Sequence, residues 1–148
     1  MMFGPETFDG VNPWAVSVSA VATMVIGFVW YSPFLFARPW MRLMGHDPND
    51  AAQTAAMQKS AGRQYAVTFV ATIVSAIVLA KIIDLTSVNT VLYGMKVGFF
   101  VWLGLVATVQ LTGALFGKQS PKLFLINTGY QLVCYVTMGA ILAKWPHP

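Results

Sequence analysis

Four side chains that could bind a ligand recur at helical spacing near the end of the chain. Asn127, Tyr130, Gln131 and Cys134 occupy positions i, i+3, i+4 and i+7 and so share one helical face. An amide in an apolar environment is costly without a hydrogen-bond partner. We therefore expect Asn127 and Gln131 to bond across a helix bundle, with Gln110 or a threonine as candidate partners. The predicted interior polar cluster of Gln110, Asn127, Tyr130 and Gln131 either joins helices or binds a ligand.

The residues that catalysis needs are scattered or missing. The two histidines, His46 and His147, lie in a loop and at the terminus, and the sequence has no HExxH, GxSxG, P-loop or CxxC motif. Haem ligation would need a histidine within an apolar segment. Cys134 is the single cysteine, which excludes an intrachain disulfide and a cysteine-based metal site. We predict no catalytic residue, no metal site and no cofactor, and hence a protein that is not an enzyme.

The composition indicates a membrane protein. Hydrophobic residues make up 57% of the chain and charged residues only 9%, against roughly 25% charged residues in a soluble domain. So few charges cannot supply the polar surface that water requires. The net charge of +4 comes from basic residues that flank apolar segments. This arrangement is typical of contact with anionic lipid headgroups, and we expect no nucleic-acid partner.

Four apolar segments are long enough to cross a bilayer, which takes about 20 residues of helix. They cover residues 13–32, 65–83, 91–116 and 123–145. We predict an all-α polytopic membrane protein, with one four-transmembrane-helix bundle domain that uses residues 1–148. The residues before the first span include Glu6 and Asp9 but no Lys or Arg. A cleavable signal peptide begins with basic residues, so we expect the first span to remain in the mature protein.

The basic residues predict the orientation of the bundle. The connections that follow the first and third spans carry six of them: Arg38, Arg42, Lys59, Arg63, Lys118 and Lys122. The opposite side carries three: Lys81, Lys96 and Lys144. Because cytoplasmic loops are enriched in Lys and Arg, both basic connections are predicted to be cytoplasmic and both termini to lie outside.

The stretch WYSPFLFARPW, residues 30–40, predicts a corner at the membrane surface. Pro33 should end the first span, because a proline disfavours helix in the preceding residue. The aromatic residues then alternate with arginines in a pattern that suits a short interfacial segment. The residues expected at this interface, where the arginines bind anionic headgroups, are Trp30, Tyr31, Arg38, Trp40 and Arg42. Trp30 and Trp40 are predicted to lie at similar depth, with the chain bent between them.

A helical extension is predicted after this corner. The sequence DPND offers Asp47 as the N-cap and Pro48 as the first helical residue. The alanine-rich residues 51–61 should be helical but are too polar to insert into lipid. We expect them to project into the cytoplasm and to continue through Gly62 into the second span.

Small residues at intervals of four predict close helix contacts, either within the bundle or between protomers. The helix-packing candidates are Ser19, Thr23, Gly27, Gly94, Gly98, Gly113 and Gly117. Gly104, Thr108 and Thr112 continue the pattern in the third span, and the second span carries a polar stripe of Thr68, Thr72 and Ser75. Lys96 lies shallow enough to reach the headgroups, with a salt bridge to Asp84 as the alternative.

Three stretches carry a resemblance to a known family: GFVWYSPFLFARPWMRLMG, LFGKQSPKLFLIN and INTGYQLVCYVTMGAILAKW. Together they resemble DUF1761 (domain of unknown function 1761), a family of small bacterial integral membrane proteins. The resemblance covers the chain from about Trp14 to Trp145, and WYSP is its most specific motif. It implies a small four-helix integral membrane protein, and it carries over no catalytic residues. We expect the bacterial cytoplasmic (inner) membrane as its location, with the termini, which the basic residues place outside, in the periplasm.

Two functions fit these features. The small-residue surfaces and the interfacial segment favour a structural or accessory subunit of a homo-oligomer or of a larger membrane complex. Its partners would be lipid and further copies or other membrane subunits. Alternatively, the polar stripes line a path for passive transport of a small uncharged solute or lipid. A proton- or cation-coupled transporter is disfavoured, because no acidic residue lies deep in a span.

Overall fold

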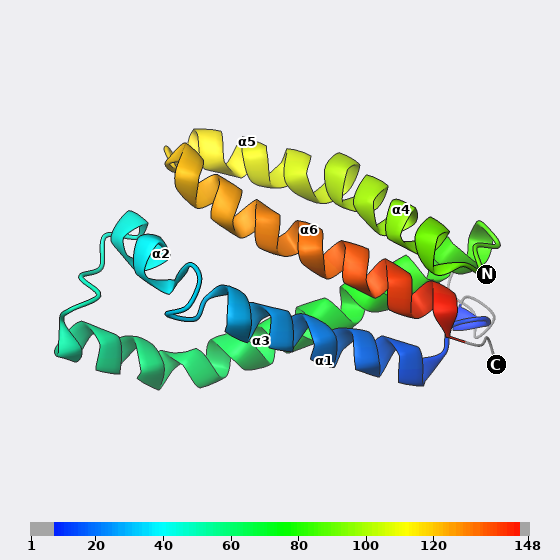
Figure 1. The fold of residues 1–148 in the computed structure, drawn as a ribbon, viewed down its shortest axis with the longest axis horizontal. Helices are drawn as coiled ribbons and strands as arrows, with labels where there is room; N and C mark the ends of the chain where they lie inside the picture. The colour runs from blue at the N-terminus through cyan, green and yellow to red at the C-terminus, as the bar shows by residue number, and fades with distance from the viewer. Residues whose placement is uncertain (1–7, 146–148) are drawn as a thin grey trace.

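A computed structural model describes residues 8–145, and throughout this range the regular structure is helical (Figure 1). The elements in chain order are α1 (Pro13–Trp30), α2 (Ala37–Leu43), α3 (Ala51–Leu85), α4 (Val91–Val101), the π-helix η2 (Trp102–Ala107), α5 (Thr108–Phe116) and α6 (Pro121–Lys144). Four segments are long and apolar enough to span a membrane: α1, α3, the continuous run from Val91 to Phe116, and α6. The predicted four-span, all-α architecture is confirmed. Glu6 and His147 lie outside the described residues.

Two of the spans, α1 and α6, begin with the same capping arrangement. Pro13 and Pro121 each stand at the first helical position, after an N-cap residue whose side chain accepts a backbone N–H. The Asn12 side chain bonds the amide of Trp14 at 2.9 Å, and Ser120 Oγ bonds that of Leu123 at 3.1 Å. These caps fix where α1 and α6 start.

The predicted extension and the second span form one helix, α3, of 35 residues. At 1.5 Å per residue such a helix is about 50 Å long and exceeds a hydrocarbon core of about 30 Å. Its first part runs beyond the bundle beneath α2 (Figure 1). The predicted N-cap was wrong by three residues. Asp50, rather than Asp47, accepts the amides of Ala52 and Gln53, at 2.9 and 3.1 Å, and Asp47 instead accepts from Asn49.

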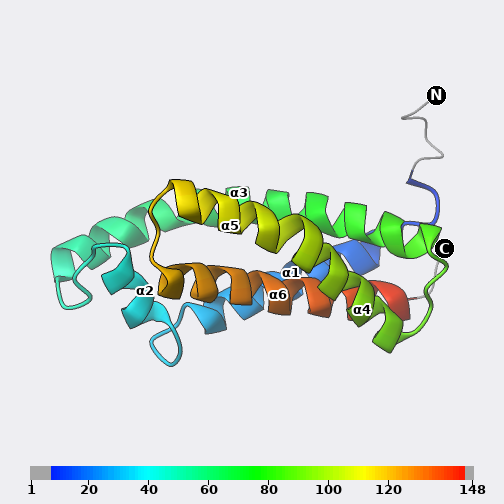
Figure 2. The ribbon, with the colours of Figure 1, turned by 90° about the horizontal axis from the view of Figure 1, so that it is seen from above.

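The third span has the predicted bounds but an unpredicted wide turn. The π-helix η2 separates α4, which makes an extensive contact with α6, from α5, which meets α6 over a short stretch. Figure 2 shows α5 leaving the layer of α6 while α4 stays beside it. Because a π-turn inserts an extra residue into the helix, it reorients the faces of α5 relative to α4.

Glycines allow the close approach of α4 and α6. A Cβ atom built on Gly94 would collide with the carbonyl of Gly139, and one on Gly98 with the carbonyl of Tyr135. A Cβ on Gly139 would in turn meet the backbone of Gly94. The two backbones are therefore in direct contact, as small-xxx-small motifs permit.

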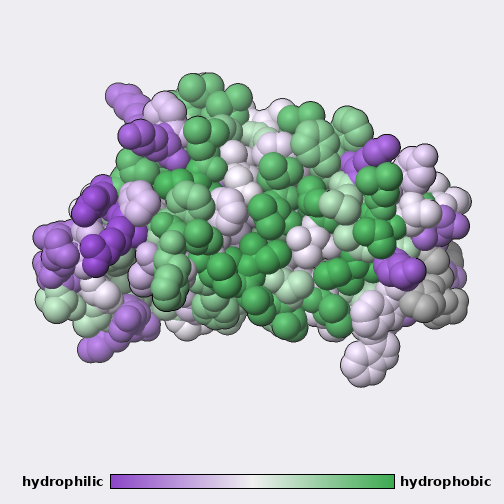
Figure 3. Space-filling model, in the orientation of Figure 1, coloured by the Kyte–Doolittle hydropathy of each residue, from purple (hydrophilic) through white to green (hydrophobic). Residues whose placement is uncertain are grey.

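The buried core lies where α1, α3 and α6 meet, around Leu79, Ile83 and Met138, which are each 1% exposed. The outside is apolar: Val109 is 69% exposed and Phe116 is 87% exposed. Figure 3 shows hydrophobic side chains over the middle of the molecule and hydrophilic ones over α2, the start of α3 and the α5–α6 turn. Lipid is the environment that suits such a surface.

The acidic residue Asp84 pairs with Lys81 at 3.0 Å instead of with Lys96. Lys81 also donates to the backbone carbonyl of Asp9 at 2.9 Å, which ties the end of α3 to the segment before α1. Lys96 is exposed and lies over the ring of Tyr93, 4.9 Å from its centre. The predicted alternative of a Lys96–Asp84 salt bridge is therefore wrong in this structure.

Candidate functional site

The predicted polar cluster divides between two cavities at different positions along α6. Tyr130 and Gln131 line a cavity between α1, α3 and α6, which we call the bundle cavity. Gln110 and Asn127 line a second one between α5, α6 and the end of α2, which we call the turn cavity. Asn127, Tyr130 and Gln131 share one side of α6, as their spacing predicts. That side faces α5 and the end of α2 at Asn127, and it faces α1 and α3 at Tyr130 and Gln131.

The bundle cavity has a volume of about 220 Å³ and a polar, uncharged lining. Its polar residues are Thr23, Thr68, Thr72, Ser75, Tyr130, Gln131, Cys134 and Tyr135. The polar stripes predicted separately for the first, second and fourth spans thus converge here. No charged side chain is among the described residues that line it.

Several hydroxyl groups of the bundle cavity are already satisfied by backbone carbonyls. Thr23 Oγ1 donates to Ala20 and Thr72 Oγ1 to Thr68, each at 2.8 Å. Tyr130 Oη approaches the carbonyl of Thr23 at 3.4 Å. The Gln131 amide therefore offers the cavity both a donor and an acceptor.

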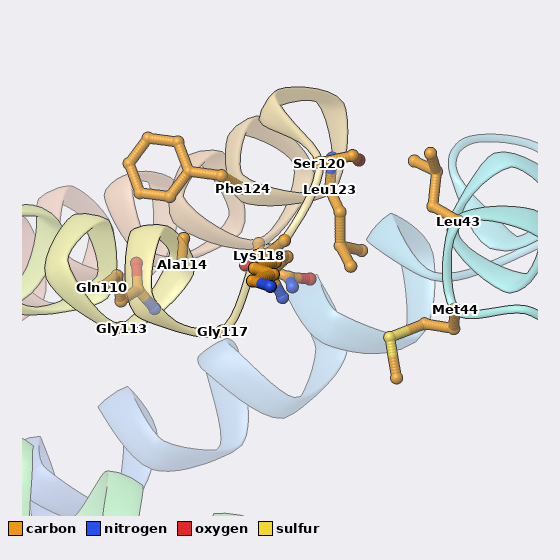
Figure 4. Close-up of a pocket in the computed structure, with 12 residues that line it drawn as sticks. Leu43, Met44, Gln110, Gly113, Ala114, Gly117, Lys118, Ser120, Leu123 and Phe124 are labelled. Atoms are coloured by element: carbon orange, nitrogen blue, oxygen red, sulfur yellow. The ribbon is translucent and has the colours of Figure 1, made fainter.

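The turn cavity is larger, at about 610 Å³. In Figure 4, Gln110 of α5 lies on one side, Leu43 of α2 and the following residue Met44 lie on the other, and Lys118 and Leu123 lie between them. The side-chain oxygen of Gln110 is buried without a hydrogen-bond partner among the described residues. An unpaired buried acceptor is costly, so the Gln110 oxygen is a polar atom that the described fold leaves unsatisfied on α5.

Three aromatic residues hold consecutive residues of α6 and form what we call the aromatic clasp. Trp30 Nε1 donates to the carbonyl of Ile126 at 3.0 Å, and Trp102 Nε1 donates to that of Thr128 at 2.9 Å. Between them, Tyr31 Oη donates to Asn127 Oδ1 at 2.9 Å. The clasp connects the end of α1 and the π-helix to the same turn of α6.

The clasp changes the interpretation of the WYSP motif. Trp30 and Tyr31, expected at the lipid interface, are half-buried, and their polar atoms bond α6. The ring of Trp30 packs on Phe36 at 4.8 Å, and that of Tyr31 packs edge-on against Trp40 at 5.7 Å. The chain bends as predicted, and the bent segment folds back onto the bundle. Arg38 and Arg42 remain exposed.

Most of the predicted packing residues lie at helix contacts. Ser19 and Thr23 are 0% and 2% exposed, and Gly27 leaves room for Tyr130, whose hydroxyl lies 3.1 Å from a Cβ built there. Gly94 and Gly98 form the α4–α6 contact described above. Gly113 faces open space in the described structure, and Gly117 lies one residue beyond α5 as its C-cap.

Sequence reasoning missed Trp102, Gly129 and Gly139. Gly139 completes the α4–α6 contact, and Gly129 lies against Trp30, whose ring would be 3.3 Å from an added Cβ. A glycine in a predicted span is a weak signal by itself, because membrane helices are rich in glycine. The indole of Trp102 belongs to a turn that the sequence does not reveal as π-helical.

The chemistry available in both cavities is hydrogen bonding. In the described part of the chain, no three His, Cys, Asp or Glu residues come close enough to hold a metal ion. Both linings combine amides and hydroxyls with apolar side chains, and Lys118 is the charged residue at the turn cavity. The arrangement can bind polar groups and orient them.

A comparison with known families identifies the chain. The family model described as "Protein of unknown function (DUF1761)" matches residues 14–143. The chain therefore belongs to this family, and the resemblance carried by the WYSP motif and the two later stretches is confirmed. No curated protein and no solved structure matches the sequence.

Proposed function

We propose that this member of the DUF1761 family is a structural or accessory subunit that assembles into a homo-oligomer or a larger membrane complex. The observation that carries the proposal is an outer stripe on the third span, formed by Gly104, Thr108 and Thr112. These residues are spaced by four and point to one side. Gln110, two residues from both threonines, lies toward α6, so the stripe faces away from the bundle.

The outer stripe is shaped for contact with another helix. Thr108 Oγ1 donates to the carbonyl of Gly104 at 2.7 Å, and Thr112 Oγ1 to that of Thr108 at 3.0 Å. The hydroxyls are thus satisfied without a partner, and a Cβ on Gly104 would meet nothing within 4 Å among the described residues. Such a stripe lets a second backbone approach closely.

The same kinds of residue are buried wherever helices of this chain meet closely. Ser19 and Thr23 are buried between α1 and its neighbours, and Gly94 and Gly98 are buried against α6. On the outer stripe they are exposed, beside the large apolar side chains of Leu105 and Val109. A matching helix from a second copy, or from another membrane subunit, would complete the pattern.

The proposed setting is the bacterial inner membrane, with the basic end of the bundle in the cytoplasm and both termini in the periplasm. The support is the gathering of Arg38, Arg42, Lys59 and Arg63 on α2 and the first half of α3. Anionic headgroups are the expected partners of these residues.

Disulfide crosslinking tests the proposed assembly. In a Cys134→Ala background, Thr108→Cys should form crosslinked products in native membranes. Val109→Cys, which is also exposed but points to another side, should not. A product of twice the chain's mass identifies a homo-oligomer, and a product of another mass identifies a different subunit that supplies a cysteine at this contact. Equal crosslinking by both variants, or recovery of a bare monomer by native mass spectrometry, would overturn the proposal.

The bundle cavity favours a second candidate, a passive path for a small uncharged solute or lipid. Its lining comes from three spans and is polar without charge. A solute that crosses there would exchange hydrogen bonds with Gln131 and with the hydroxyl groups of α3. A charged solute would have no counter-ion along this lining, and burying a charge unpaired is expensive.

A further inference from the structure

The two ends of the turn cavity differ in character, and we call the end at the α5–α6 turn its mouth and the end further along α5 and α6 its inner end. Lys118, Gln119 and Ser120, in the turn between α5 and α6, form one end of its lining. Gln110 and Asn127 each lie about two helical turns further in, which is about 11 Å along their helices. Apolar side chains from α2 and α6, including Leu43 and Leu123, form the walls between these ends. A ligand that fills the cavity must therefore carry polar groups at both ends of the cavity and apolar groups against the walls between them.

The electrostatic character of the mouth is positive. Lys118 is exposed there, and no acidic residue is among the described residues that line the cavity. The N-terminus of α6 begins at the same place, with Ser120 as its N-cap, and adds the positive end of a 24-residue helix. Together they favour an anionic group at this end of the cavity.

The inner end offers two amides. Asn127 Oδ1 accepts from Tyr31, which leaves the Asn127 amide nitrogen for a ligand. Gln110 lines the same end of the cavity, and only its side-chain oxygen is buried and unpaired, which leaves its amide nitrogen accessible to a ligand. Two amide donors at this depth suit the ester carbonyls that join acyl chains to glycerol.

We propose that the turn cavity binds an anionic phospholipid. The phosphate pairs with Lys118 at the mouth, and the ester carbonyls reach the amides of Gln110 and Asn127. One acyl chain runs along the apolar walls and leaves through the open side into the bilayer. A volume of about 610 Å³ fits the headgroup and glycerol region, and it lies within the range of about 300–1,000 Å³ of ligand sites. A free phosphate ion would leave the apolar walls and the amides unused.

Native mass spectrometry of the full chain in detergent tests this site with phosphatidylglycerol and phosphatidylcholine of identical acyl chains. We expect at least ten-fold stronger retention of phosphatidylglycerol. Lys118→Asn should reduce that retention at least five-fold, and asparagine suits the positive φ of 52° at this residue. Lys122→Ala is the matched control, because Lys122 is exposed one turn away and does not line the cavity.

A second pair of variants tests the cavity itself. Gly113→Leu should fill it and reduce retention at least ten-fold, whereas Gly62→Leu should change nothing. Both glycines are helical and face open space among the described residues, so both variants should fold. Equal retention of the two lipids, equal effects within either pair, or displacement of lipid by an equal concentration of inorganic phosphate would each overturn the proposal. None of these variants changes a residue of the outer stripe. The lipid-binding test can therefore fail while the proposed assembly holds, and the reverse is also true.

Discussion

The hydroxyl of Tyr31 donates a hydrogen bond of 2.9 Å to the side-chain oxygen of Asn127 across 96 positions of sequence. Tyr31 is the residue at which α1 ends, and Asn127 lies in the second turn of α6. The bond joins the corner after the first span to the fourth span. It also gives the Asn127 side-chain oxygen a donor that it would otherwise lack in an apolar bundle.

Replacing Tyr31 with Phe should therefore destabilise the fold. The ring and its contacts with Trp40 and Tyr130 remain, but the Asn127 oxygen loses its donor. Hydrogen bonds between membrane helices contribute about 0.6 kcal/mol on average and up to about 1.7 kcal/mol. We expect a loss within this range in the free energy of unfolding, measured by titration with sodium dodecyl sulfate in mixed micelles.

Two further variants show whether the loss of unfolding free energy in Tyr31→Phe comes from the hydrogen bond to Asn127. In a double-mutant cycle with Asn127→Leu, the Tyr31→Phe change should cost less than it does alone, because its partner is already absent. Tyr93→Phe is the control, since Tyr93 is more than half exposed and its ring remains beside Lys96. Strict additivity of the two changes would show that the bond contributes nothing to stability.

The spans were predictable because lipid imposes a simple rule on sequence. A helix must stay apolar for about 20 residues, and the run from Val91 to Phe116 starts and stops where that rule predicts. The partner of Asn127 was not predictable in the same way. A tyrosine at the end of a span can lie at the lipid interface, as aromatic residues commonly do, or it can donate a hydrogen bond to a buried amide. The sequence is compatible with both roles, and only the fold shows which one Tyr31 has.

Glycines in the third span should respond oppositely to substitution. Gly98→Ala places a methyl group against the carbonyl of Tyr135 and should cost at least about 2 kcal/mol, because overpacking forces backbones apart. Gly113→Ala enters open space and should be neutral or stabilising by up to about 1 kcal/mol, because alanine favours helix. Thermal unfolding in detergent measures both. Similar shifts for the two variants would contradict the α4–α6 contact.

The same span shows why the polar cluster was predicted only in part. Periodicity correctly placed four polar residues on one side of α6. It could not show that the π-helix turns α5 outward, so that Gln110 reaches one cavity and Gln131 another. An extra residue in a helical turn cannot be recognised in an apolar sequence. The side of the helix on which each later residue lies is therefore not predictable from a spacing of about 3.6 residues per turn.

The start of α3 provides a local test. Asp50→Ala removes the acceptor for the amides of Ala52 and Gln53 and should cost about 1 kcal/mol at this helix end. Hydrogen exchange of residues 51–54 should become about five-fold faster, while the bundle is unchanged. Asp47→Ala should have a smaller effect on these amides, since Asp47 bonds Asn49 outside the helix. A larger effect from Asp47 would return the N-cap to the residue predicted from sequence.

Solute flux in proteoliposomes decides whether the bundle cavity is a path. If it is, reconstituted protein should accelerate glycerol entry over protein-free liposomes in stopped-flow light scattering. Gln131→Leu should then reduce the added flux at least ten-fold, because an apolar side chain removes the amide from the cavity. Gln110→Leu makes the same chemical change in the turn cavity and should leave flux unaltered. Equal losses in both variants would place any path elsewhere, and wild-type flux no faster than protein-free liposomes would reject the second candidate function and leave the assembly proposal standing.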